Sequence, residues 1–222
     1  MKVISIADRA AAVSDRIAAA CHKAGRPPGD VTIVAVSKTF PPQAIKEAVA
    51  AGMRHIGENR VQEAAEKRPE LEGLPAVWHL VGHLQTNKAK QAIKLFDVIE
   101  SVDSFHLAEE ISRRADRTLS VLLEVNVAGE ESKFGYTPEQ ALREAEKIGA
   151  LPHLDVRGLM TVAPLTDDAE TVRPVFRRLR ELRDALGLRE LSMGMTDDFE
   201  VAIEEGSTMV RIGRAIFGER PQ

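Results

Sequence analysis

The chain has 222 residues, of which 44% are hydrophobic and 29% are charged, a balance typical of a globular protein with a full core. Thirty Lys and Arg residues against thirty-four Asp and Glu residues give a net charge of -4. This charge argues against a nucleic-acid binder, which usually presents a basic surface. Cys21 is the single cysteine, so no disulfide can form within the chain and a reducing compartment is expected.

The alanine-rich N-terminus resembles a signal peptide only in composition. Charged residues such as Asp8, Arg9 and Arg16 interrupt any apolar stretch that a signal peptide would need. No segment approaches the roughly 18 uncharged apolar residues of a membrane span. We therefore expect a cytoplasmic protein that binds no membrane.

An amphipathic helix is predicted over residues 1–25, where Gly25 and the following prolines end it. Its apolar residues recur at three- or four-residue spacing: Val3, Ile6, Ala10, Val13, Ile17 and Ala20.

Eight short apolar segments, each followed by a helical pattern, succeed it along the chain. The predicted strands are 31–38, 53–57, 76–82, 97–101, 120–127, 154–160, 191–195 and 207–213. The predicted helices between them begin at Pro41, Glu58, Thr86, Ser104, Pro138 and Thr166, and Thr196 is expected to cap one more.

Strands that alternate with helices indicate parallel βαβ units. We predict an α/β fold, a single (β/α)8 TIM-type barrel that covers residues 1–222 as one domain, with the helix of residues 1–25 packed on it. A doubly wound open sheet is the structural alternative.

In such a barrel, functional side chains gather at the carboxyl ends of the strands. Lys38 ends the first predicted strand and shares a face with Val34 and Val36, since strand side chains alternate. At the mouth of an apolar barrel, partial burial would lower the pKa of this lysine and free its amine to attack a carbonyl. A solvated lysine at a strand end is the simpler alternative.

The end of the chain has the features of a phosphate site. Gly213 follows the eighth predicted strand and lets an anion approach backbone amides at a helix N-terminus. The preceding loop offers the hydroxyls of Ser192 and Thr196, and Arg211 has the parity to point into the barrel mouth. Glycines that serve only tight turns, and an arginine in a structural ion pair, are the alternatives.

A carbonyl-trapping lysine, a phosphate cradle and an inward arginine together suggest a phosphorylated aldehyde as the ligand, of which pyridoxal 5'-phosphate is the commonest. The histidines show no spacing typical of metal ligands, so no metal is expected.

Several segments together resemble the YggS/PROSC family of pyridoxal phosphate homeostasis proteins. They run in the same order from Val31 to Gly218: VAVSKTFPPQAI, HIGENRVQE, WHLVGHLQTNK, GLMTVAP and LSMGMTDDFEVAIEEGSTMVRIGRAIFG. The resemblance implies a barrel similar to the N-terminal domain of alanine racemase.

The resemblance also implies roles for individual residues. Lys38 would form the internal aldimine, and Arg211 would contact the pyridine nitrogen. The phosphate would be held by Ser192, Thr196, Gly213 and the backbone of Arg214. Asn59 would lie beside the cofactor ring, with Met160 nearby. Many relatives have threonine where Arg214 stands, which is why a backbone contact is expected there.

An arginine at the ring nitrogen keeps that nitrogen unprotonated, and the ring is then a poor electron sink. The implied function is intracellular homeostasis of pyridoxal 5'-phosphate, held as a Schiff base without robust turnover and passed to apo-enzymes by a monomeric carrier. Two alternatives remain open. One is a fold-type III enzyme such as an amino-acid racemase, and the other is a barrel aldolase that uses Lys38 on a sugar phosphate.

Overall fold

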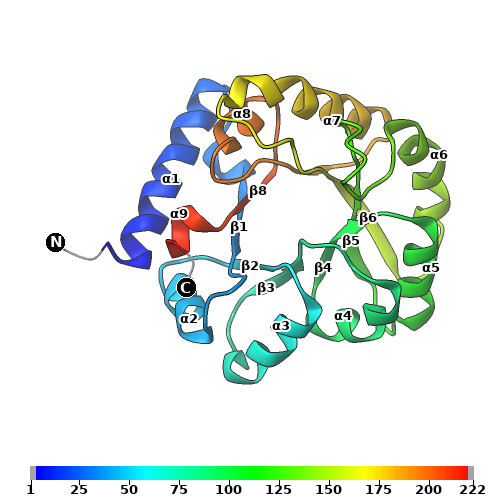
Figure 1. Cartoon of the computed structure of the whole chain (residues 1–222), viewed down its shortest axis with the longest axis horizontal. Coiled ribbons are helices and arrows are strands. Elements are labelled where there is room, and N and C mark those ends of the chain that lie inside the picture. The colour runs from blue at the N-terminus through cyan, green and yellow to red at the C-terminus, as the bar shows by residue number, and fades with distance from the viewer. Residues whose placement is uncertain (1–3, 220–222) are drawn as a thin grey trace.

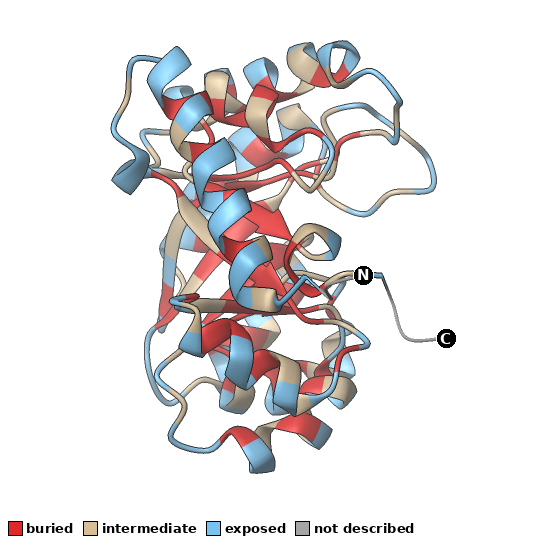
Figure 2. Ribbon diagram, turned by 90° about the vertical axis from the view of Figure 1, so that its left-hand side faces the viewer, coloured by how far each residue is buried: buried red, intermediate tan, exposed pale blue. Residues whose placement is uncertain are grey.

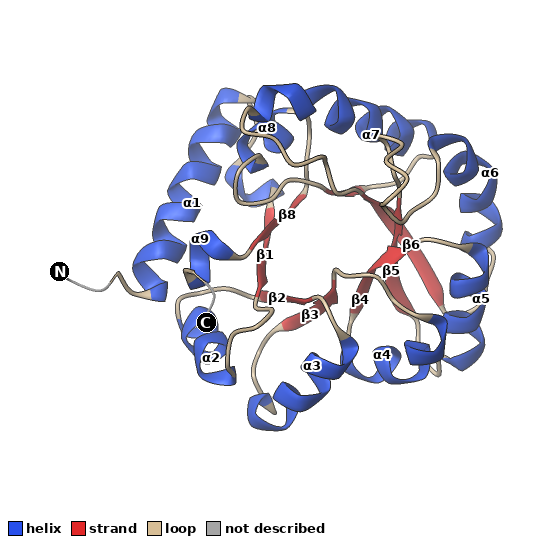
Figure 3. Ribbon diagram, viewed as in Figure 1, coloured by secondary structure: helices blue, strands red, loops and turns tan. Residues whose placement is uncertain are grey.

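The computed structural model describes residues 4–219, and within that range eight parallel strands pair in sequence order into a closed barrel (Figures 1 and 3). The strands are β1 (Thr32–Val36), β2 (His55–Glu58), β3 (Val77–Leu80), β4 (Val98–Val102), β5 (Leu119–Glu124), β6 (Leu154–Met160), β7 (Glu190–Ser192) and β8 (Met209–Ile212). Pairing of β1 with β8 closes the ring. The predicted barrel is confirmed, and the open-sheet alternative is excluded.

A ring of helices surrounds the strands (Figure 3). The α-helices are α1 (Ile6–Lys23), α2 (Pro42–Ala50), α3 (Val61–Lys67), α4 (Ala89–Leu95), α5 (Phe105–Arg114), α6 (Pro138–Gly149), α7 (Arg173–Ala185), α8 (Phe199–Glu204) and α9 (Arg214–Phe217). Short 3-10 turns are η1 (Pro28–Asp30), η2 (Arg68–Leu71), η3 (Thr86–Lys88) and η4 (Ala169–Val172).

The strands are buried on both faces, as the apolar sequence of β1 requires. Ala35 packs in the layer between barrel and helices. A side chain added at Gly57 on β2 would meet Val34 and Val36, so these two valines point into the barrel interior. Figure 2 shows buried residues concentrated in the strands and on the inner sides of the helices. The alternation therefore continues towards Lys38 on the interior face.

Helix α1 is the predicted extra N-terminal helix. Its N-cap Ser5 forms a capping box with Asp8, and its apolar face, including Val13 and Ile17, is buried. It packs against α8 and α9, next to the last strand of the barrel. Val3, which the predicted helix included, lies outside the described residues.

Three predicted helix starts are wrong. The helix expected from Glu58 begins at Val61, because Glu58 is the last residue of β2 and its carbonyl oxygen accepts from the amide of Val81. The helix expected from Thr166 begins later, because the Asp168 side chain accepts from the amide of Glu170 and caps η4 instead, with α7 starting at Arg173. Thr196 does not cap α8, which has Asp198 at its N-cap.

None of the helices within residues 4–219 has the length and apolar character needed to cross a lipid bilayer.

Candidate functional site

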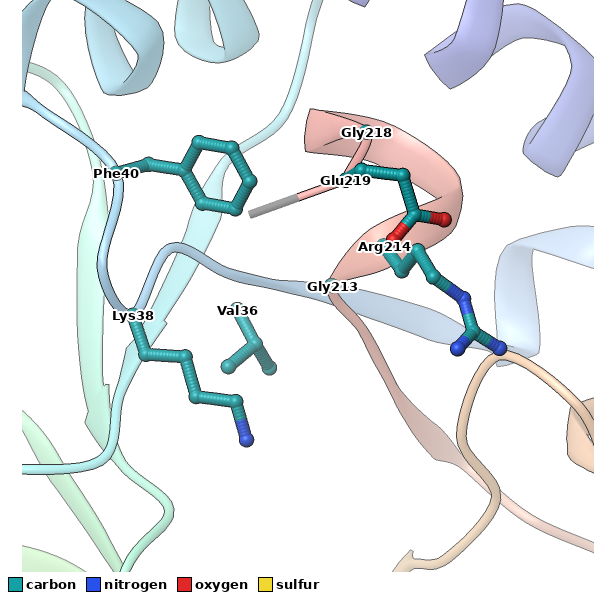
Figure 4. A pocket seen from close by; sticks show the side chains of 7 residues that line it. All are labelled: Val36, Lys38, Phe40, Gly213, Arg214, Gly218 and Glu219. Atoms are coloured by element: carbon teal, nitrogen blue, oxygen red, sulfur yellow. The ribbon is translucent and has the colours of Figure 1, made fainter. Parts of the chain in front are cut away.

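A pocket of about 350 Å³ opens where β1 and β8 end (Figure 4). From the β1 side it is lined by Val36, Lys38 and Phe40, and from the β8 side by Gly213, Arg214, Gly218 and Glu219. The half-buried side chain of Lys38 extends along it beside Val36. A primary amine and the joint between a strand and a helix thus line the same cavity.

The wall of the pocket is apolar near Lys38. Phe40 stacks on Phe217 of α9, with ring centroids 5.2 Å apart. The two rings and Val36 thus make the β1 side of the pocket largely apolar.

The β8–α9 joint brings backbone close to the pocket. Gly213 is the N-cap of α9, and a Cβ there would lie 3.3 Å from the carbonyl oxygen of Val36. Amides in the first turn of a helix have no partner within the helix and are donors for an anion. The guanidinium of Arg214 is bound to Asp197 through two contacts of 2.8 Å. The joint therefore offers backbone donors, while the Arg214 side chain has a carboxylate partner of its own.

Arg211 lies inside the barrel, with 5% of its surface exposed. It donates to the carbonyl oxygen of Thr161 at 2.7 Å and to the hydroxyl and carbonyl oxygens of Ser192 at 2.6 and 2.8 Å. Arg211 on β8 is thus bonded to Ser192 on β7 and to Thr161 just after β6, and these bonds fix the position of its guanidinium.

A buried carboxylate balances this charge. Glu100 of β4 lies 4.0 Å from Arg211, accepts from the Ser192 hydroxyl at 2.5 Å and is bonded to His79 at 2.6 Å. Burial raises the pKa of Glu100, but the His79 hydrogen bond and the Arg211 charge outweigh it and hold that pKa below its usual range. The interior thus carries an ionised pair in an otherwise apolar barrel.

The remaining predicted residues lie around the pocket rather than in its lining. Ser192 is fully buried, with its hydroxyl bonded to Glu100 and Arg211. Met160 packs inside the barrel with Val98 and Leu122. Thr196 is half-buried in the β7–α8 loop. The phosphate roles of Ser192 and Thr196 stay predictions, and the structure gives the Ser192 hydroxyl other partners.

Asn59 lines a second cavity, of about 490 Å³, together with residues such as Arg60, His83 and Lys88. The first pocket therefore unites Lys38, Gly213 and Arg214 from the predicted set. In the described part of the chain, no three His, Cys, Asp or Glu side chains are grouped so as to hold a metal ion.

The sequence reasoning missed Glu100, Glu58 and Lys67, all of which are buried. A carboxylate within an apolar strand, such as Glu100 in DVIES, is a signal that could have identified the first. Lys67 gives no such signal, because a lysine on a helix is ordinarily solvated.

The alanine racemase N-terminal domain model matches residues 9–221. A pyridoxal phosphate homeostasis protein of Aquifex aeolicus is 47% identical, covering 96% of this chain and 97% of its own length. The protein of that name from Pseudomonas aeruginosa is 46% identical, covering 97% and 96%.

Solved structures agree with this. PipY of Synechococcus elongatus, solved with PLP bound, is 40% identical with a TM-score of 0.82, covering 93% of this chain and 100% of its own. An alanine racemase of Clostridium difficile shares the fold, at 16% identity and a TM-score of 0.72, over 97% of this chain and 58% of its own. The chain therefore belongs to the alanine racemase N-terminal domain family and, within it, to the pyridoxal phosphate homeostasis proteins.

Proposed function

We propose that this protein binds pyridoxal 5'-phosphate at Lys38 and acts in its intracellular homeostasis, holding and releasing the cofactor without robust turnover. One observation carries the proposal: the Lys38 amine and the backbone joint at Gly213 line the same pocket. When bound, the cofactor supplies an aldehyde that condenses reversibly with a primary amine.

The residues present fit such a ligand. The pocket lies within the volume range of small-molecule sites. We assign the aldehyde end to Lys38 and the phosphate to the amides at Gly213 and Arg214, with the Thr196 loop beside them. Val36 and Phe40 give the β1 side of the pocket an apolar lining. The curated relatives named for pyridoxal phosphate homeostasis, and PipY with PLP bound, support pyridoxal 5'-phosphate as the ligand.

Arg211 is the proposed partner of the pyridine nitrogen. It remains a hydrogen-bond donor, because arginine keeps its proton under ordinary conditions and Glu100 balances its charge. Ser192 then acts through Arg211 by bridging it to Glu100. Asn59 and Met160 are proposed to lie near the ring. A ring nitrogen that accepts from arginine is left unprotonated, which disfavours carbanion chemistry and favours storage.

The position of Tyr136 supports binding without turnover. It is the only tyrosine, and its backbone bridges Val125 after β5, across the barrel from β1 and Lys38. Burial raises the pKa of the Tyr136 hydroxyl above its usual value. This hydroxyl is therefore a poor proton donor and acceptor for a substrate at Lys38. We further propose that the protein is a cytoplasmic monomer and that it delivers pyridoxal 5'-phosphate to apo-enzymes.

In the test, cofactor-free protein is titrated with pyridoxal 5'-phosphate, unbound cofactor (itself yellow) is removed by gel filtration, and the visible absorbance of the protein fraction is read. We expect the wild type to turn yellow at stoichiometric cofactor and Lys38→Ala to remain colourless. Lys88→Ala removes a lysine from the neighbouring cavity and serves as the matched control, with wild-type absorbance expected. A yellow Lys38→Ala protein would contradict the proposal.

A second arm of the same experiment addresses turnover. The yellow protein is incubated with a panel of L-amino acids in deuterated solvent, and exchange at Cα is followed by NMR. We expect no catalytic exchange. Exchange with many turnovers would identify an enzyme instead of a carrier.

A further inference from the structure

The turn that carries Lys38 has an unfavourable backbone. After β1 ends, the amide of Phe40 donates to the carbonyl oxygen of Ser37 at 3.0 Å, so residues 37–40 form a tight turn. Thr39 in this turn has a φ of 69°. The left-handed region is rare for β-branched residues, and this turn position usually takes glycine or asparagine. Contacts from outside the turn must therefore hold it.

Lys67, at the end of α3, supplies such contacts. Its ammonium donates to the carbonyl oxygen of Ser37 at 2.9 Å, to Glu58 at 2.8 Å and to Glu63 at 2.6 Å. An ammonium has three protons, so these three bonds use its full donor capacity.

The two carboxylates carry the connection to the other side of Lys38. Glu63 accepts from the backbone amide of Thr39 at 2.5 Å, and Glu58 accepts from the hydroxyl of Ser37 at 2.6 Å. Both sequence neighbours of Lys38 are thus tied to a single ammonium, through one direct bond and two carboxylate bridges.

This cluster is largely out of water. Lys67 is 7% exposed and Glu58 is fully buried. Burying an ammonium and a carboxylate offsets much of their attraction, so such pairs add little net stability. The contacts of such a pair do fix the geometry of the groups that they join. Here the geometry imposed is that of the backbone on either side of Lys38.

We propose that Lys67, through Glu58 and Glu63, is a positioning residue that locks the 37–40 turn and directs the Lys38 amine into the pocket. This inference rests on the proposed function of Lys38. Without the cluster, Thr39 relaxes towards ordinary φ values and the Lys38 side chain leaves its place beside Val36 in the pocket.

The test compares Lys67→Met with wild type in two assays. Titration with pyridoxal 5'-phosphate should give a dissociation constant raised between about tenfold and about a hundredfold, the range for losing a residue that orients a binding group. In cofactor-free protein, reductive methylation of Lys38 relative to the exposed Lys90, read by mass spectrometry, should rise severalfold because the amine is less sheltered.

Arg173→Met is the matched control. Arg173 bonds Glu204 at the end of α8 and the buried Glu205 at its C-cap, so its loss disrupts a comparable ion cluster away from the Lys38 turn. It should leave both the dissociation constant and the methylation ratio at wild-type values. Thermal unfolding of all variants identifies any protein that is not folded.

Glu63 provides an independent route should Lys67→Met not fold. Glu63→Leu removes the acceptor of the Thr39 amide and should reproduce both changes, whereas Glu63→Gln retains an acceptor oxygen and should stay closer to wild type. Wild-type affinity and methylation in folded Lys67→Met or Glu63→Leu would overturn the positioning role while Lys38→Ala stays colourless. A yellow Lys38→Ala would instead overturn the proposed function.

Discussion

At the scale of single residues, the candidate site depends on Lys38 and on the backbone turn that carries it. Period-two alternation through Val34 and Val36 predicted the face on which its side chain lies, and the prediction holds although β1 ends at Val36. The contacts of Lys67 that hold the turn of residues 37–40 could not be predicted from alternation. Lys67 acts there only because α3 folds back beside the end of β1, a tertiary contact that leaves no local pattern.

Glu124, at the end of β5, gives a residue-scale prediction about pH. Burial, aided by the negative charge of Asp103, raises its pKa from 4.5 to about 7. The folded state therefore binds the Glu124 proton more tightly than the unfolded state does. This proton binding stabilises the fold fully below pH 4.5, and the stabilisation is lost as the pH rises through about 7.

Glu124→Gln removes this titration. Urea unfolding at several pH values should show similar free energies of unfolding near pH 4.5 and a growing advantage for the variant up to pH 7. We expect a difference of about 2 kcal/mol, less than the full shift implies because the side chain is partly exposed. A difference between the two proteins that does not vary with pH would contradict this account.

At the scale of elements, apolar periodicity was enough to predict the strands and most helices. The errors lie at helix starts. Asp168 caps η4 and delays α7, and Asp198 rather than Thr196 stands at the N-cap of α8. The Asp168 side chain accepts from the amide of Glu170, whereas the Asp198 side chain accepts from the amide of Met195 ahead of α8, and sequence spacing alone does not predict such loop contacts.

Helix α1 gives the prediction at this scale. Ile17 is 2% exposed and belongs to the main hydrophobic core, so Ile17→Ala should lower the free energy of unfolding by about 3 kcal/mol. Ile4, which precedes the helix and is 58% exposed, is the control, and Ile4→Ala should change stability by less than about 0.5 kcal/mol. Equal effects in chemical denaturation would show that α1 is not part of the packed core.

At the scale of the whole molecule, barrel closure creates the site. Lys38 and Gly213 lie near opposite ends of the chain, and they meet because β1 pairs with β8, with Val34 beside Arg211 and Ala35 beside Ile212. An open doubly wound sheet would lack that closing pair. A prediction of the closed barrel therefore includes the prediction that the Lys38 amine and the backbone at Gly213 lie near each other.

The interior ion pair is the part that closure alone does not predict. Glu100 and Arg211 approach each other across the barrel, and their distance depends on how Ser192 and His79 fill the space between them. The sequence indicated that Arg211 had the parity to face inward. It did not indicate the carboxylate that balances its charge.

The central claim is that one amine captures the cofactor, and covalent trapping tests it most directly. Protein incubated with pyridoxal 5'-phosphate is reduced with borohydride, digested and mapped by mass spectrometry. The account predicts a single pyridoxyl group on the peptide that contains Lys38. A label on Lys88, Lys67 or any other lysine, with Lys38 unmodified, would contradict it.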